Sequence, residues 1–163
     1  MNGMENGRRP KAKILVVDDQ MAVALMMIFL LTRAGCEAEV ATNAEKALRL
    51  AQSEVFDLIT LDVGIPDLDG FRLFQKLRQI PHLKETPVVF VSGNSTIENQ
   101  QHALDLGAVD FIEKPFDAPD FVSRILSWVK PEEARPKFHP FNVSNGDMGA
   151  DAKRLCHTTQ SNQ

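Results

Sequence analysis

The sequence predicts an α/β fold, a doubly wound five-stranded parallel sheet of the flavodoxin-like type, with order 2-1-3-4-5 and five flanking helices. Short apolar runs alternate five times with stretches of helical periodicity, which is typical of a parallel sheet covered by helices on both faces. The run that leads into Asp62 is almost wholly apolar, as expected of a strand buried on both faces. Right-handed crossovers leave few topologies for such a chain.

Five strands are expected from these runs. They lie at residues 14–17, 37–41, 58–62, 88–91 and 109–113. Helices are expected between and after them, at about residues 20–33, 42–52, 69–80, 95–106 and 117–130.

Capping residues mark the helix boundaries. Thr42-Asn43-Ala44-Glu45 has the pattern of a capping box. Gly35 is placed to end the first helix in the left-handed conformation, and Gly107 stops the fourth. Pro119 suits the first turn of the last helix.

Length and composition indicate one domain. A chain of 163 residues with 44% hydrophobic residues has room for one core. The domain is expected at residues 12–130. Residues 1–11 and 131–163 are polar and interrupted by proline or glycine, so we expect flexible segments, the second too short and polar for a further catalytic or DNA-binding domain.

Charge and hydropathy exclude several classes of function. The net charge of −4 disfavours direct nucleic-acid binding, which usually requires a basic face. No apolar run reaches the roughly 20 residues that a membrane-spanning helix needs, and no signal peptide is visible. A cytoplasmic protein without membrane contact is expected.

Polar groups stand where four neighbouring strands end. They are Asp18 and Asp19 after the first strand, Asp62 at the third, Ser92 at the fourth and Lys114 at the fifth. In the order 2-1-3-4-5 these ends meet, and open α/β sheets bind ligands at that edge. Each residue alone is explained as a helix cap or a solvated turn, but their convergence indicates a functional site.

We predict that Asp62 is a nucleophile that accepts a phosphoryl group, because a carboxylate can attack phosphorus to form an acyl phosphate. Three carboxylates packed closely repel one another. A divalent cation relieves this repulsion, and Mg²⁺ favours one or two carboxylates with waters and a phosphate oxygen. We therefore expect Asp19 and Asp62 to bind Mg²⁺ directly and Asp18 to act through water.

Three further residues would surround the transferred group. The Lys114 ammonium would stabilise the charge on its equatorial oxygens. The Ser92 hydroxyl would donate a hydrogen bond to it, and Gly93 leaves space and a backbone N–H beside it.

This set of residues resembles the receiver domain of bacterial two-component response regulators, of the single-domain, chemotaxis-regulator-like kind. The resemblance covers residues 12–130 and rests on Asp18-Asp19, Asp62 with Pro66 and Asp69-Gly70, Ser92, and Lys114-Pro115. It implies Mg²⁺-dependent phosphorylation of Asp62 by a histidine kinase or a histidine phosphotransfer protein. It also implies a signalling protein, which catalyses only its own phosphotransfer and dephosphorylation.

The resemblance further implies a switch. Family members carry an aromatic residue three positions before the lysine, which is Phe111 here, and commonly a cis peptide at the position of Lys114-Pro115. Ser92 would move toward the phosphoryl group and Phe111 would turn inward, changing the protein-binding face of the fourth helix, fifth strand and fifth helix. From the sequence, Phe111 is equally well explained as a core aromatic.

The chain departs from the family pattern at three positions. Ile65 replaces the common methionine before Pro66, which keeps the site apolar. Gly64 offers a backbone carbonyl to the metal but no side chain, and Asn94 offers an amide in place of a charged group. Gly64 and Asn94 border the path of the attacking water in the family, so the lifetime of the phosphoryl group stays open.

The first helix is apolar around nearly its whole circumference. Its sheet-facing side is expected to hold Val23, Met26, Met27, Leu30 and Leu31. Its outer side would then hold Met21, Leu25, Ile28 and Phe29, where a surface helix is normally polar. We predict a partner-docking patch on this outer side. The family resemblance implies the same, because this helix meets the kinase or phosphotransfer helices in the family. The alternative is that the N-terminal segment or the tail covers the patch.

Other functions have to be separated from this one. The chain could be the receiver part of a longer regulator whose output domain is missing, or a receiver-like module that binds partners without phosphorylation. Magnesium titration would identify the second, because a degenerate pocket should not respond. A phosphatase of the haloacid dehalogenase type needs a second aspartate, its general acid, two residues after the nucleophile. Gly64 stands at that position, which argues strongly against this class of enzyme.

Overall fold

The computed structural model describes residues 11–131 and 134, which form the predicted sheet and its helices. The strands are β1 (Lys13–Val17), β2 (Glu37–Ala41), β3 (Leu58–Leu61), β4 (Val88–Ser92) and β5 (Asp110–Glu113). The helices are α1 (Met21–Arg33), α2 (Ala44–Ser53), α3 (Gly70–Arg78), α4 (Ile97–Leu106) and α5 (Ala118–Trp128), with a short 3₁₀ turn, η1 (Pro81–Leu83), that the sequence did not predict.

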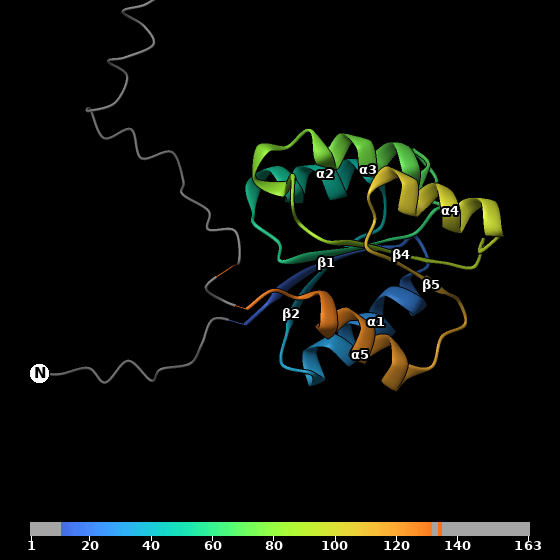
Figure 1. The fold of residues 1–163 in the computed structure, drawn as a ribbon. Helices are drawn as coiled ribbons and strands as arrows, with labels where there is room; N and C mark the ends of the chain where they lie inside the picture. Colours follow the sequence, from blue (N-terminus) through green and yellow to red (C-terminus); the bar gives the residue numbers. More distant parts are fainter. Residues whose placement is uncertain (1–10, 132–133, 135–163) are drawn as a thin grey trace, which may run out of the picture.

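All five strands are parallel, in the order β2-β1-β3-β4-β5, as predicted. Helices α2, α3 and α4 lie on one face of the sheet, and α1 and α5 lie on the other (Figure 1). Val17, the last residue of β1, pairs with Ala41 on one side and Leu61 on the other. This register brings the carboxyl ends of the central strands to the same edge.

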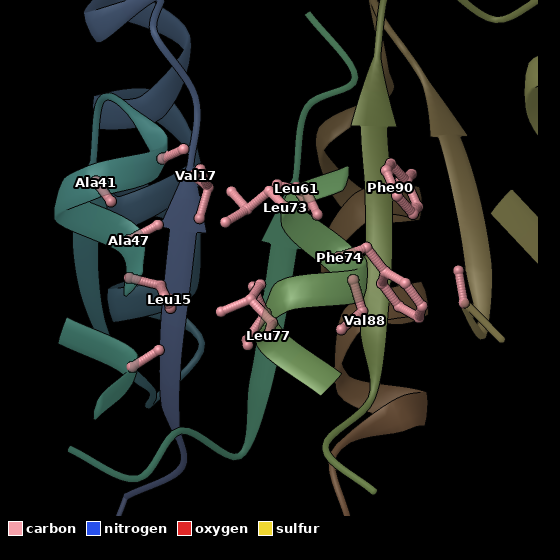
Figure 2. Close-up of a cluster of buried hydrophobic side chains, with 14 of the residues drawn as sticks. Leu15, Val17, Ala41, Ala47, Leu61, Leu73, Phe74, Leu77, Val88 and Phe90 are labelled. Carbon is pink, nitrogen blue, oxygen red and sulfur yellow. The ribbon is translucent and has the colours of Figure 1, made fainter. Parts of the chain in front are cut away.

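Each face of the sheet builds its own core, because alternate strand residues point to opposite sides. Leu15 and Val17 face α2 and α3, in a cluster with Leu73 and Phe74 (Figure 2). The intervening Ile14 and Val16 belong to a second cluster with residues of α1 and α5. The strands are therefore buried on both faces, which explains their nearly continuous apolar runs.

Local capping sets the helix starts, with one correction at α2. Asn43, rather than Thr42, is the N-cap, and its side-chain oxygen accepts a hydrogen bond from the Lys46 N–H at 2.8 Å. The capping box predicted at 42–45 is therefore wrong by one residue. The Glu45 N–H, which a Thr42 cap would have bonded, donates to Asp67 Oδ2 at 3.1 Å instead.

Asp69 caps α3 and Asp117 caps α5, where those helices were expected to begin. Helix α4 begins later than the expected Ser95, because Thr96 is its N-cap. Gly35 and Gly107 have φ values of +90° and +107°, in the left-handed region that favours glycine.

Helix α1 turns a narrower face to the sheet than expected. Its fully buried side chains are Ala24, Met27 and Leu31, spaced as one helical stripe. Met26, predicted to face the sheet, is 45% exposed, because it lies about 100° around the helix from Met27. Ile28, predicted to lie outward, is half-buried and packs against the second core.

The predictions for residues 1–11 and 131–163 fall on segments of which the structure describes only Lys11, Pro131 and Ala134. Among the described residues, no helix has the length and hydrophobicity needed to cross a membrane.

Candidate functional site

Hydrogen bonds that continue the sheet place the predicted site residues. The Asp18 N–H donates to the Ala41 carbonyl at 3.1 Å, and the Asp62 N–H donates to the Val17 carbonyl at 3.0 Å. The Lys114 N–H donates to the carbonyl of Ser92 at 3.0 Å. The backbone ladder thus brings residues from four strand ends to one edge.

Lys114 joins two of the carboxylates. Its Nζ lies 2.5 Å from Asp18 Oδ2 and 2.9 Å from Asp62 Oδ2. Asp18 is fully buried and Asp62 is 7% exposed, so both interactions are largely shielded from water. The second oxygens are held by the backbone, Asp18 Oδ1 by the Gln20 N–H at 2.9 Å and Asp62 Oδ1 by the Gly64 N–H at 3.2 Å.

Burial and pairing shift the pKa values of these groups. Burial raises the pKa of the Asp18 carboxyl above its ordinary value, and the hydrogen bond from Lys114 offsets this only in part. For Lys114, burial acts to lower the pKa, but the hydrogen bonds to Asp18 and Asp62 outweigh it and the pKa is raised. Lys114 is therefore a cation at neutral pH.

The acidic residues fit a hard divalent cation. Carboxylate oxygens of Asp18, Asp19 and Asp62 lie within 4.8 Å of one another. Asp19 is exposed while the other two are buried, so the cluster opens toward solvent on one side. Mg²⁺ is bound by oxygen ligands and keeps several waters, which suits a half-open group of this kind.

A cavity of about 600 Å³ opens beside this cluster. Its polar lining includes Asp19, Asp62, Ser92, Asn94 and Lys114. Gly64 and Gly93 also line it, as the predicted roles of both residues require. Ser92 is 1% exposed, and its Oγ accepts a hydrogen bond from the Asn94 N–H at 3.1 Å, which leaves the hydroxyl proton able to be donated into the cavity.

The other wall of the cavity is apolar and was not predicted from the sequence. Val23 and Met26 of α1 and Pro115 and Phe116 of the β5–α5 loop form this wall. Phe116 is held in place by stacking on the buried Phe121, with ring centroids 4.6 Å apart. One feature of the sequence could have indicated this wall: Phe116 stands only two residues after Lys114, at the same strand end.

Phe111 is buried and stacks on Phe90 of β4, with centroids 6.1 Å apart and the rings 12° from parallel. The peptide Lys114-Pro115 is cis. Of the residues predicted to form the docking patch, Met21, Leu25 and Phe29 are 49%, 55% and 58% exposed.

Residues 14–126 match the family of response regulator receiver domains. The chain belongs to this family. Among its curated relatives, the transcriptional activator protein IrlR of Burkholderia pseudomallei is 33% identical over 123 residues, which are 76% of this chain and 52% of IrlR. The transcriptional regulatory protein PcoR of Escherichia coli is 34% identical over 118 residues, 72% of this chain and 51% of PcoR. The chain spans about half the length of these relatives.

Solved structures of receivers agree with this assignment. A CheY-like receiver domain protein from Methanospirillum hungatei aligns with a TM-score of 0.70 at 28% identity, covering 76% of this chain and 97% of that one. The chemotaxis protein CheY4 of Vibrio cholerae aligns with a TM-score of 0.68 at 32% identity, covering 74% and 99%.

This receiver is thus a phosphoacceptor module of two-component signal transduction. Receiver domains are signalling modules that are phosphorylated by histidine kinases. Several relatives are named as transcriptional regulators. The absence of direct nucleic-acid binding therefore stays a prediction.

Proposed function

We propose that Asp62 of this receiver accepts a phosphoryl group from the phosphohistidine of a kinase or a phosphotransfer protein. One observation carries the proposal: the Asp62 carboxylate lies in the wall of an open cavity, with the Lys114 ammonium 2.9 Å away. A carboxylate with a cation beside it and space in front of it is arranged for attack on an incoming phosphoryl group.

The transfer makes one bond and breaks one. A carboxylate oxygen of Asp62 forms a bond to phosphorus, and the bond from phosphorus to the histidine nitrogen breaks, with its electron pair returning to the imidazole. The product is an acyl phosphate. Lys114 is held at the site by Asp18, so its charge is already positioned when the equatorial oxygens gain charge.

The acidic cluster would hold the cofactor. Asp19 and Asp62 would bind Mg²⁺ directly, with the Gly64 carbonyl, and Asp18 would act through water. When bound, Mg²⁺ neutralises charge on the phosphoryl oxygens. The Ser92 hydroxyl, whose oxygen already accepts from the Asn94 N–H, would donate to a phosphoryl oxygen, and Gly93 would leave room beside it.

Phosphorylation would act as a switch through Ser92 and Phe111. Ser92 ends β4, and Phe90, two residues earlier on the same strand, stacks on Phe111 of β5. A shift of Ser92 toward the phosphoryl group would therefore be transmitted to the packing of Phe111. The surface that changes is formed by α4, β5 and α5.

The phosphodonor would dock on α1. Met21, Leu25 and Phe29 are exposed on this helix, with the half-buried Ile28 at their edge, and the neighbouring Met26 lines the cavity itself. An apolar surface that continues to the rim of the cavity suits a helical partner that carries its histidine beside an apolar face. A cytoplasmic protein without membrane contact, catalysing only its own phosphotransfer and dephosphorylation, is part of this proposal.

Intact mass spectrometry after incubation with acetyl phosphate and Mg²⁺ tests the phosphoacceptor role. The parent is expected to gain one phosphoryl group and the Asp62→Asn variant none, while Asp69→Asn, at the start of α3, serves as an acidic control that still reacts. Addition to Asp62→Asn would move the acceptor elsewhere. No addition to the parent from acetyl phosphate or from a phosphohistidine donor would favour a module that binds without phosphorylation.

A further inference from the structure

The turn between β2 and α2 lines no part of the cavity, yet it holds both loops that carry the acidic residues. Its Ala41 carbonyl accepts the N–H of Asp18 at 3.1 Å. Its Ala44 N–H donates to Asp67 Oδ1 at 2.8 Å, and its Glu45 N–H donates to Asp67 Oδ2 at 3.1 Å. Asp67 reaches this turn from the β3–α3 loop, 23 residues further along the chain.

Asp67 and Asn43 serve the same helix end in different ways. The first N–H groups of a helix have no partner within it and favour a negative charge. Asn43 caps α2 locally through the Lys46 N–H. Asp67 takes the two N–H groups before that one, with both carboxylate oxygens, and so ties a distant loop to the helix.

The β3–α3 loop is the segment that shapes the site around Asp62. At its far end Gly70 packs directly on Asp62, since a side chain at Gly70 would overlap the Asp62 carbonyl oxygen. The Gly70 N–H donates to the Val63 carbonyl at 2.8 Å. Within this loop Gly64 lines the cavity, and its N–H donates a hydrogen bond to Asp62 Oδ1. The position of the loop therefore decides where that oxygen points.

We infer that Asp67 is a positioning residue, which ties the β3–α3 loop to α2 and thereby keeps Asp62 and Gly64 oriented for Mg²⁺ and the phosphoryl group. This inference rests on the proposed function of the site. Without the carboxylate of Asp67, the loop keeps its buried residues Val63 and Ile65 but loses its two hydrogen bonds to α2. Metal binding then weakens although every residue that touches the metal is unchanged.

The test compares Asp67→Ala with Asn43→Ala in the full chain. Both variants remove a cap from the same helix, but only the first releases the loop. Mg²⁺ affinity by calorimetry, the rate of phosphorylation by acetyl phosphate at saturating Mg²⁺ and the melting temperature are measured for each. Both melting temperatures are expected to fall, whereas Mg²⁺ affinity falls by about tenfold in Asp67→Ala only, the usual loss when a group that orients a metal ligand is removed.

Asp67→Asn adds a graded control. Its single acceptor oxygen can keep one of the two hydrogen bonds, so its Mg²⁺ affinity is expected between those of the parent and Asp67→Ala. Parental affinity in Asp67→Ala, or an equal loss in Asn43→Ala, would overturn the inference. If the parent takes no phosphoryl group but Asp67→Ala still weakens Mg²⁺ binding, the proposed function fails and the positioning role stands.

Discussion

Asp110, the first residue of β5, shows how one carboxylate joins two elements next to the switch. It accepts hydrogen bonds from Arg124 Nη2 at 2.5 Å and Nε at 3.0 Å, and from Trp128 Nε1 at 3.3 Å. Arg124 Nη2 also donates to the carbonyl of Phe111 at 3.0 Å. Arg124 of α5 thus joins this helix to β5 at Phe111, the residue whose packing is proposed to change in the switch.

These contacts make the stability of the receiver depend on pH. Burial acts to raise the pKa of Asp110, but the hydrogen bonds from Arg124, the Phe111 N–H and Trp128 outweigh it, so the pKa lies below its ordinary value of 3.8. Because the folded pKa is depressed, the stabilisation is complete above that ordinary value and is lost as the pH falls through the folded pKa.

Asp110→Asn is therefore expected to lower the free energy of unfolding at pH 7 by about 1.5–3 kcal/mol, the usual contribution of hydrogen bonds to a charged group. The difference from the parent should shrink as the pH is lowered below about 4. Urea unfolding at several pH values measures it. Asp120→Asn is the control, because that exposed carboxylate forms a longer and weaker ion pair with Arg124, at 3.6 Å. A difference that is the same at every pH would contradict the assignment.

At the scale of one element, helix α1 divides its apolar residues between three surroundings. Met27 and Leu31 fill the second core, Val23 and Met26 line the cavity, and the outer residues face solvent. Most of the helix circumference is apolar because one side packs in the core, a second lines the cavity and the third is the proposed docking patch. This is the reason for placing the phosphodonor on it.

Replacing Leu25 and Phe29 together by serine tests the docking patch. Phosphotransfer from a phosphorylated histidine phosphotransfer protein is expected to slow by about thirtyfold. Apolar anchors that act as hot spots contribute more than about 1 kcal/mol each, and about 1.4 kcal/mol corresponds to a factor of ten. Phosphorylation by acetyl phosphate should not change, since neither side chain lines the cavity. Leu104→Ser on α4, where the leucine is 48% exposed, is the matched control. Equal loss with both donors would contradict the docking role.

At the scale of the whole molecule, parallel strand order concentrates charge at one edge. Three carboxylates from two strand ends meet there and one ammonium, from a third strand end, partly neutralises them. The fold therefore carries unbalanced negative charge at its site, and a bound cation should stabilise the entire domain.

Mg²⁺ at about 100 times its dissociation constant is expected to stabilise the folded receiver by about 2.7 kcal/mol, measured as a rise in melting temperature. Asp19→Asn should melt higher than the parent without Mg²⁺, because one repelling charge is gone, and should respond little to the ion. NaCl at matched ionic strength and Asp105→Asn, an exposed carboxylate on α4, are the controls. An equal Mg²⁺ response in the parent and Asp19→Asn would place the ion elsewhere.

Local signals in the sequence were sufficient for most of the fold. Burial of each strand on both faces leaves an apolar run, and capping residues such as Asp69 and Asp117 act within three residues of their own position. The capping box predicted at 42–45 was wrong by one residue, because Asn43, next to Thr42, is an equally good cap and bonds the Lys46 N–H. Helix α1 was misjudged at Met26 because a helix that is apolar all round offers no contrast from which to read its buried face.

The sequence by itself determined the fold class, the strand order and the meeting of Asp18, Asp19, Asp62, Ser92 and Lys114, because these follow from the alternation of strands and helices and from what stands where each strand ends. Only the tertiary structure decided that Lys114 bridges Asp18 and Asp62, that Met26 and Phe116 wall the cavity, and that Asp67 ties its loop to α2. Those contacts join residues far apart in the chain, and their geometry depends on how neighbouring layers pack, which no local pattern of residues encodes.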